Sequence, residues 1–305
     1  MAVPGKKCTF VSDMKNIVRK FFLPLVSAVA FLFPSSSEAQ SLLWKISGKG
    51  LPQESYLFGT IHLIPAKDFF LPRGTDSLLL ASKKLVIEMD ISDPTLQMRL
   101  MSAMMLDSGK TLASLYTPKE YGYLAKKLEK DYGLPVAVLG NMKPILVQQS
   151  LMMKQMMGGD FKSYEKEFMS KVEGKDIPIV GLETLEDQLG ALNSMPLEEQ
   201  AKGLLKAVKN PKDGEKSLGK LIEKYKKQDI DGLYNSINGE GEDLKKYEED
   251  LLVNRNKNWI PKITEMAGRE RIFIAVGAAH LGGETGVINL LRKEGYTVEP
   301  VLTKN

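Results

Sequence analysis

The chain has 305 residues, of which 43% are hydrophobic and 26% charged, and its formal net charge at pH 7 is +4. This composition supplies enough apolar side chains for one large domain or two small ones and is unlike that of a disordered chain. The only cysteine is Cys8, which excludes a fold stapled by internal disulfides.

The first 39 residues have the pattern of a secretory signal peptide. Lys15, Arg19 and Lys20 precede the apolar run 21–33, and Ser37-Glu38-Ala39 is a small-x-small cleavage sequence. An uncleaved membrane anchor is the alternative, but the apolar run is shorter than the about 20 residues that cross a bilayer. We therefore expect cleavage after Ala39 and a periplasmic or secreted protein that meets the membrane only during export.

The mature chain would be almost neutral. Removing residues 1–39 takes away five Lys or Arg and two Asp or Glu, which lowers the net charge from +4 to +1. No basic surface for nucleic acid is expected. Cys8 lies within the leader, so any metal site in the mature protein must use histidine and oxygen ligands.

Two β-like runs, 42–46 and 55–63, begin the mature chain and are separated by a Gly- and Pro-containing loop. This pattern predicts a β-hairpin. The second run delivers His62.

A helix is predicted over 72–82, and a strand over 84–89 that ends in Glu88-Met89-Asp90. An acid at the carboxyl end of a strand occupies the same kind of position as His62. A solvated strand end is the alternative interpretation, because Asp and Glu are rarely buried without a partner.

Residues 94–175 are predicted to form a helical insertion. Two groups of methionines recur in it at helical spacing. They favour a packed core, an adaptable groove for apolar side chains, or a copper(I) site, and the sequence leaves all three open. The residues are Met98, Met101, Met104 and Met105, and then Met152, Met153, Met156 and Met157.

The run 177–182 predicts another short strand, with Glu183 at its carboxyl end. Glu183 has three possible roles: a metal ligand, a hydrogen-bond partner of a histidine, or an acid in the first turn of the next helix.

A second helical insertion is predicted over 189–268. Most of its charges fit solvated helix faces. Arg255 is different because it lies on an apolar stripe with Leu251 and Trp259. A charge in that position needs a buried carboxylate or a ligand pocket.

The last elements form a predicted β-α-β unit. The run 272–276 is an unbroken apolar strand, typical of a parallel sheet, and Gly277-Ala278-Ala279-His280 follows it directly. A helix then extends to Gly295, ahead of a strand over 296–301.

His62 and His280 are the only histidines in the chain. Both stand in Gly-x-x-His-Leu directly after a predicted strand, and ligands of α/β sheets bind at the carboxyl ends of strands. We therefore predict an α/β fold whose central sheet brings His62, Glu88, Glu183 and His280 to one site from two β-α units. Helices should cover the sheet, and the two insertions should cap the site.

Such a site suits a divalent metal ion. His62, His280 and Glu88 are the expected ligands, and zinc, manganese and cobalt all accept mixed nitrogen and oxygen donors. Glu88 or Glu183 could accept a proton from water, and Arg255 could stabilise an oxyanion or hold a substrate carboxylate. A zincin is excluded because no two histidines are four residues apart, and no Gly-x-Ser-x-Gly elbow is present.

The segments YLFGTIHL and AVGAAHLGGETGVINLLRKEGY resemble the paired Gly-x-x-His motifs of the TraB/GumN family. That family includes the Tiki metal-dependent proteases and the pheromone-shutdown TraB proteins. The segments LVIEMD, IVGLETLEDQ and LLVNRNKNW also resemble family blocks in the family's order, so the resemblance covers nearly all of residues 40–305 as one domain. It supports Glu88 as a site carboxylate and places Arg255 in a pocket.

The expected function is that of an exported metal-dependent hydrolase, a peptidase acting on peptides or unfolded protein segments. The alternative is a non-catalytic protein that sequesters peptides or haem-like ligands, because two histidines, an arginine and a methionine-lined groove also suit capture. Structural histidines satisfied within the core are the remaining alternative.

Overall fold

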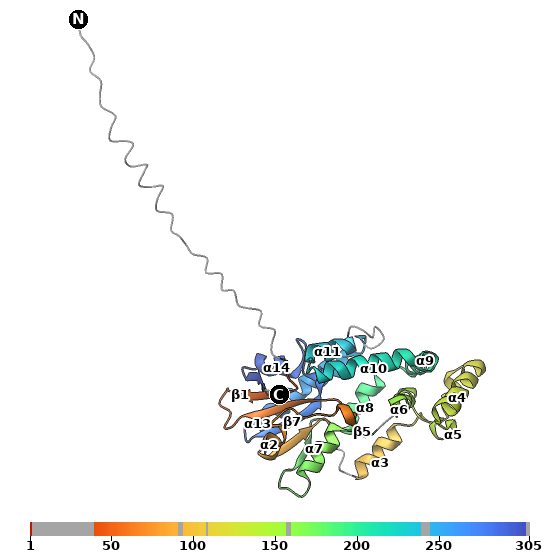
Figure 1. Cartoon of the computed structure of the whole chain (residues 1–305), viewed down its shortest axis with the longest axis horizontal. Coiled ribbons are helices and arrows are strands. Elements are labelled where there is room, and N and C mark those ends of the chain that lie inside the picture. Colours follow the sequence, from red (N-terminus) through yellow and green to blue (C-terminus); the bar gives the residue numbers. More distant parts are fainter. Residues whose placement is uncertain (2–39, 91–93, 108, 157–159, 239–244, 303–305) are drawn as a thin grey trace. The chain divides into compact units, whose positions relative to one another are not determined.

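The computed structural model describes residues 1, 40–90, 94–107, 109–156, 160–238 and 245–302. The predicted signal peptide lies outside the described residues except for Met1. The described residues from Gln40 onward belong to one compact unit (Figure 1). In this part of the chain, every helix is too short or too polar to traverse a bilayer.

A six-stranded mixed sheet, in the order β6-β4-β7-β2-β1-β8, forms the centre of this unit. Every strand runs parallel to the others except β1, which is antiparallel to both of its neighbours. The predicted α/β class with a central sheet is confirmed. The strands are β1 (Leu43–Ser47), β2 (Ser55–Thr60), β4 (Lys84–Ile87), β6 (Ile179–Gly181), β7 (Ile272–Gly277) and β8 (Thr297–Pro300).

The burial and pairing of the strands agree with the predictions from their sequences. The central strands β2 and β7 are buried along almost their whole length, as expected for strands covered on both faces. The predicted hairpin of β1 and β2 is present, and its loop places Gly48, Lys49 and Gly50 at positive φ. The predicted β-α-β unit is also present, although β2 and β1 lie between β7 and β8.

Two helices cover one face of the sheet. They are α13 (Asn254–Ala267) and α14 (Val287–Lys293). Trp259 and Ile263 of α13 belong to the same apolar cluster as Ile274 and Val276 of β7. This packing fixes α13, which carries Arg255, against the sheet.

The other face is covered mainly by α2 (Thr75–Leu80), α7 (Tyr164–Val172) and α10 (Pro211–Lys226). Phe168 of α7 packs edge-on against Phe58 of β2 and Phe273 of β7, with ring centroids 5.1 and 5.4 Å apart. The end of the first insertion is therefore part of the main core.

The insertions also build a third cluster from α4, α5, α6 and α9, which lies to one side of the sheet (Figure 1). The region 94–175 is not wholly helical, because β5 pairs with the short strand β3 (Ile64–Pro65). The remaining elements of the first insertion are α3 (Pro94–Ala103), η2 (Leu112–Leu115), α4 (Pro118–Tyr132), α5 (Val136–Leu139), α6 (Pro144–Met156) and β5 (Phe161–Lys162). The remaining elements of the second insertion are α8 (Leu185–Asn193), α9 (Leu197–Lys209), α11 (Ile230–Asn238) and the π-helical η3 (Glu249–Val253). Two short 3-10 turns lie outside the insertions, η1 (Ala66–Asp68) and η4 (Ala278–His280).

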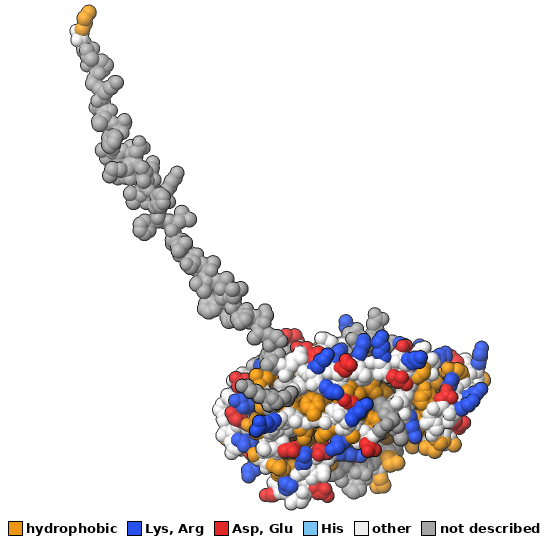
Figure 2. All heavy atoms as spheres, in the orientation of Figure 1, with side chains coloured by type: hydrophobic (Ala, Val, Ile, Leu, Met, Phe, Trp, Pro, Cys, Tyr) orange, Lys and Arg blue, Asp and Glu red, His pale blue; other side chains and the backbone are white. Residues whose placement is uncertain are grey.

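Of the three interpretations of the methionines, a packed core does not hold for several of them. Met98 of α3 is 67% exposed, and Met101, Met105, Met152 and Met153 are also exposed. These side chains lie at the surface because the insertion packs through its leucines instead. On the face shown in Figure 2, apolar, basic and acidic side chains of the described residues are interspersed.

Candidate functional site

Four of the predicted site residues follow the carboxyl ends of parallel strands. His62 follows β2, Glu88 follows β4, Glu183 follows β6 and His280 follows β7. These strands are consecutive in the sheet, in the order β6-β4-β7-β2. Segments up to 218 positions apart therefore meet at one edge, as the sequence predicted.

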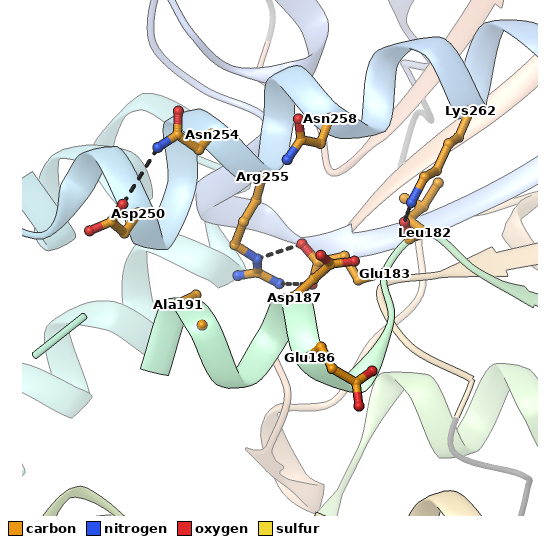
Figure 3. A pocket seen from close by; sticks show the side chains of 11 residues that line it. Leu182, Glu183, Glu186, Asp187, Ala191, Asp250, Asn254, Arg255, Asn258 and Lys262 are labelled. Atoms are coloured by element: carbon orange, nitrogen blue, oxygen red, sulfur yellow. Dashed lines mark hydrogen bonds and ion pairs between the residues drawn. The ribbon is translucent and has the colours of Figure 1, made fainter. Parts of the chain in front are cut away.

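Arg255 of α13 joins three of these ends. Its Nε and Nη2 donate to the two oxygens of Glu183 at 2.7 and 2.8 Å, and Nη2 also donates to Oε2 of Glu88 at 2.6 Å. Its Nη1 lies 3.1 Å from the Leu251 carbonyl and 3.2 Å from Nε2 of His280. All five N–H bonds of the guanidinium thus face acceptors within the chain. Figure 3 shows Arg255 directed from its helix toward Glu183.

Both carboxylates receive further hydrogen bonds. Trp259 Nε1 donates to Oε1 of Glu183 at 2.8 Å, and the Gly277 amide donates to Oε1 of Glu88 at 2.8 Å. A Cβ at Gly277 would lie 3.3 Å from that oxygen and 3.5 Å from Cδ2 of His280. The second motif glycine therefore makes room for a carboxylate and a histidine together.

His280 is buried and is held by side chains of α13. Its Nδ1 lies 2.6 Å from Oδ1 of Asn256, and its ring lies 4.4 Å from the Trp259 ring. Asn256 is itself buried and donates through Nδ2 to the Thr285 carbonyl at 2.9 Å.

His62 has a different environment, and its side chain is 73% exposed. Its Nδ1 lies 3.1 Å from Oε1 of Glu165, which comes from the first turn of α7. Thr60 and Ser163 hold the two oxygens of Glu165 at 2.7 and 3.0 Å. The two Gly-x-x-His motifs are therefore alike in sequence but unlike in burial and partner.

Arg255, Glu88, Glu183 and His280 form the buried cluster of the site. A pocket of about 270 Å³ lies beside this cluster, between α8 and α13. Glu183 and Arg255 belong to its wall, and Glu186, Asp187 and Asp250 supply further carboxylates around it (Figure 3). Glu88 and His280 are not among the residues that line this pocket.

Comparison with known protein families identifies the family of this chain. The sequence model of the TraB/PrgY/gumN family matches residues 42–300, nearly the whole of the compact unit. The chain belongs to the TraB/PrgY/gumN family. The resemblance inferred from the Gly-x-x-His motifs is confirmed.

Curated relatives of this family member are named metalloproteases. Metalloprotease TIKI2 of Danio rerio is 25% identical over 323 residues, which cover 87% of this chain and 62% of the relative. Metalloprotease TIKI1 of Homo sapiens is 27% identical over 326 residues, which cover 88% of this chain and 63% of the relative. The chain thus spans about three fifths of the length of the curated relatives it matches. No solved structure matches it.

The side chains of this TraB/PrgY/gumN protein fit a divalent ion in their donor chemistry. His62 and His280 each have Nδ1 beside an oxygen of a neighbouring side chain, as metal-binding histidines usually do, and Glu88 adds a carboxylate. Among the described residues, however, no group of three or more His, Cys, Asp or Glu side chains is arranged to hold an ion. Arg255 lies against two of the three expected ligands, so it occupies the position between them.

The titratable groups of the cluster differ in their charge at neutral pH. Burial raises the pKa of Glu88, but nearby His280, His62 and Arg255 and the Gly277 amide outweigh burial and lower that pKa to about 2. Burial lowers the pKa of His280 to about 3, aided by the charge of Arg255. At neutral pH the cluster therefore contains an ionised Glu88 and a neutral His280.

We expect His62 to be charged at neutral pH. The hydrogen bond with Glu165, aided by the charge of Glu88, raises the pKa of His62 from 6.5 to about 9. Because the pKa is higher in the folded state, charged His62 stabilises the fold fully below pH 6.5, and this contribution is lost as the pH rises through about 9. Histidine NMR titration should show the raised pKa and its return toward 6.5 in Glu165→Gln. A wild-type pKa near 6.5 would contradict the pairing.

Sequence reasoning missed two residues that hold the site, Asn256 and Glu165. Asn256 lies three residues before Trp259, a spacing that could have indicated that the two side chains meet on α13. Glu165 carried no such signal, because an acid in the first turn of a helix is usually solvated.

Proposed function

We propose that this chain is an exported, metal-dependent hydrolase of peptides or unfolded protein segments. The observation that carries the proposal is the convergence of His62, Glu88, Glu183 and His280 at one sheet edge. The relatives named metalloproteases support the same reaction class.

His62, His280 and Glu88 are the proposed ligands of a manganese, cobalt or zinc ion. When bound, such an ion supplies Lewis acidity that activates water and polarises a peptide carbonyl. The histidine nitrogens must be unprotonated to bind it. Because the pKa of His62 is raised to about 9, ion affinity should increase as the pH rises toward that value.

The hydrogen bonds assign different roles to the two carboxylates. Both oxygens of Glu183 are held by Arg255 and Trp259, and its side chain is 3% exposed. Glu88 is more accessible, at 11%. This difference favours Glu88 as the group that contacts the reacting water, and Glu183 as the partner that anchors Arg255.

Arg255 is proposed to act through these carboxylates. Since its five N–H bonds already face chain acceptors, it can donate to a substrate oxygen only by exchanging one of them. Its contacts support a role in neutralising and positioning Glu88 and Glu183.

Metal content is the test of the proposed site. The mature protein, refilled with manganese, zinc or cobalt, should contain about one ion per chain by mass spectrometry, and His62→Ala/His280→Ala should contain none. Glu54→Gln is the control, because Glu54 precedes β2 and lies at the opposite edge of the same sheet. Ion-free wild-type protein would contradict the metal-dependent reaction and leave a non-catalytic ligand-binding protein as the better account.

The N-terminus of the exported protein tests whether the signal peptide is removed. We expect protein recovered from outside the cytoplasm to begin at Gln40 and to lack a thiol, because Cys8 is removed with the leader. Intact mass and thiol labelling measure both. A full-length chain that retains Cys8 would contradict cleavage after Ala39.

A further inference from the structure

Each ring nitrogen of His280 has one polar neighbour, and both neighbours come from consecutive residues of α13. Nδ1 lies 2.6 Å from Oδ1 of Asn256, and Nε2 lies 3.2 Å from Nη1 of Arg255. The side chain of His280 is buried against Trp259 of the same helix. One helix therefore holds the ring on three sides.

The position of the ring proton follows from two groups that can play only one role each. A guanidinium donates hydrogen bonds and never accepts them, so Nε2 of His280 must be the acceptor toward Arg255. A backbone carbonyl only accepts, so the Thr285 carbonyl requires the NH₂ of Asn256. The other end of the Asn256 amide, its oxygen, then faces Nδ1 of His280. Both lines of argument place the proton on Nδ1.

We infer that Asn256 is a positioning residue that holds His280 in the Nδ1–H tautomer and presents the Nε2 lone pair to the site. Its importance for turnover rests on the proposed function. The reverse tautomer would oppose an N–H of His280 to an N–H of Arg255 and would leave the lone pair facing the Asn256 oxygen. Nε2 could then neither bind an ion nor accept a proton.

Nitrogen NMR of ¹⁵N-histidine-labelled mature protein, without metal or substrate, tests this tautomer directly. The chain has two histidines, so a His62→Gln sample assigns the signals of His280. We expect a protonated Nδ1 and an unprotonated Nε2 on His280. Asn256→Leu has similar size and no acceptor, so Arg255 alone opposes the reverse tautomer, and the fraction of molecules protonated on Nε2 should be larger than in wild type. Asn256→Asp keeps an acceptor and should preserve Nδ1–H.

Asn289→Leu is the matched control. Asn289 of α14 also donates through Nδ2 to a carbonyl of the 281–286 loop, that of Gly283 at 2.9 Å, but no hydrogen bond links it to His280 among the described contacts. Its loss should leave the histidine spectrum unchanged. Manganese or zinc affinity should fall roughly 10- to 100-fold in Asn256→Leu and remain unchanged in Asn289→Leu.

A wild-type His280 protonated on Nε2, or an unaltered Nδ1–H in folded Asn256→Leu, would overturn the inference. If Asn256→Leu does not fold, the wild-type and Asn256→Asp spectra still decide the tautomer. The spectra require neither an ion nor hydrolysis. Failure of the proposed function therefore appears as a missing ion or absent cleavage with the tautomer intact.

Discussion

Arg255→Met is expected to destabilise the fold by about 3 to 5 kcal/mol at pH 7, because it leaves two carboxylates buried without their cation. The side chains of Glu183 and Glu88 are only 3% and 11% exposed, and Arg255 itself is 16% exposed. Urea unfolding followed by circular dichroism measures the loss. The loss should shrink as the pH falls, because protonation of Glu88 relieves part of the unpaired charge in the variant.

Arg269→Met is the control for removing an arginine close to the same helix. Arg269 pairs with Glu265 at 2.7 Å, but the two side chains are 73% and 64% exposed, so this substitution should cost less than about 1 kcal/mol. Arg255→Lys keeps the charge but cannot bind Glu183 through two parallel hydrogen bonds, so it should fall between the two. If Arg255→Met costs no more than Arg269→Met, Arg255 does not neutralise the buried carboxylates.

The edge of the sheet at which the site lies could be predicted from the sequence because the strands are central. The runs that contain β2 and β7 are apolar without alternation, which indicates strands buried on both faces and so a parallel pair. Parallel neighbours bring their carboxyl ends together, and His62 and His280 stand at those ends. Arg255 could be predicted to have an acidic partner because it lies on an apolar stripe, and the structure gives it two.

The contacts that distinguish the two histidines could not be predicted. The acid beside His62 is Glu165, 103 positions later, and it reaches His62 because α7 packs on the sheet near β3 and β5. The contact between Asn256 and His280 depends on the rotation of α13 about its axis. That rotation is fixed by Trp259 and Ile263, which pack on the sheet. Periodicity gives the apolar face of a helix but not which polar neighbour meets which nitrogen.

Glu88→Gln is expected to lower peptide hydrolysis by roughly 10²- to 10⁴-fold, the usual contribution of a group that transfers a proton in the reaction. The substitution keeps the shape of the side chain and an oxygen that can accept from the Gly277 amide. It removes one negative charge and leaves Arg255 paired with Glu183, so the buried charges stay balanced. The loss of activity should therefore occur in a folded protein. Single-turnover hydrolysis of a peptide, together with urea unfolding, measures the two effects separately.

Glu54→Gln makes the same chemical change at the other end of β2, where Glu54 forms a partly exposed pair with Lys45 at 3.3 Å. It should leave hydrolysis unchanged. Peptide binding to Glu88→Gln, measured by fluorescence anisotropy, then separates chemistry from capture. Retained peptide binding and retained metal content with lost hydrolysis support Glu88 as the proton acceptor, whereas loss of the ion marks Glu88 as a metal ligand. Equal hydrolysis in Glu88→Gln and wild type would instead mean that Glu88 serves mainly to hold Arg255, and the proton acceptor would have to be sought elsewhere along the same sheet edge.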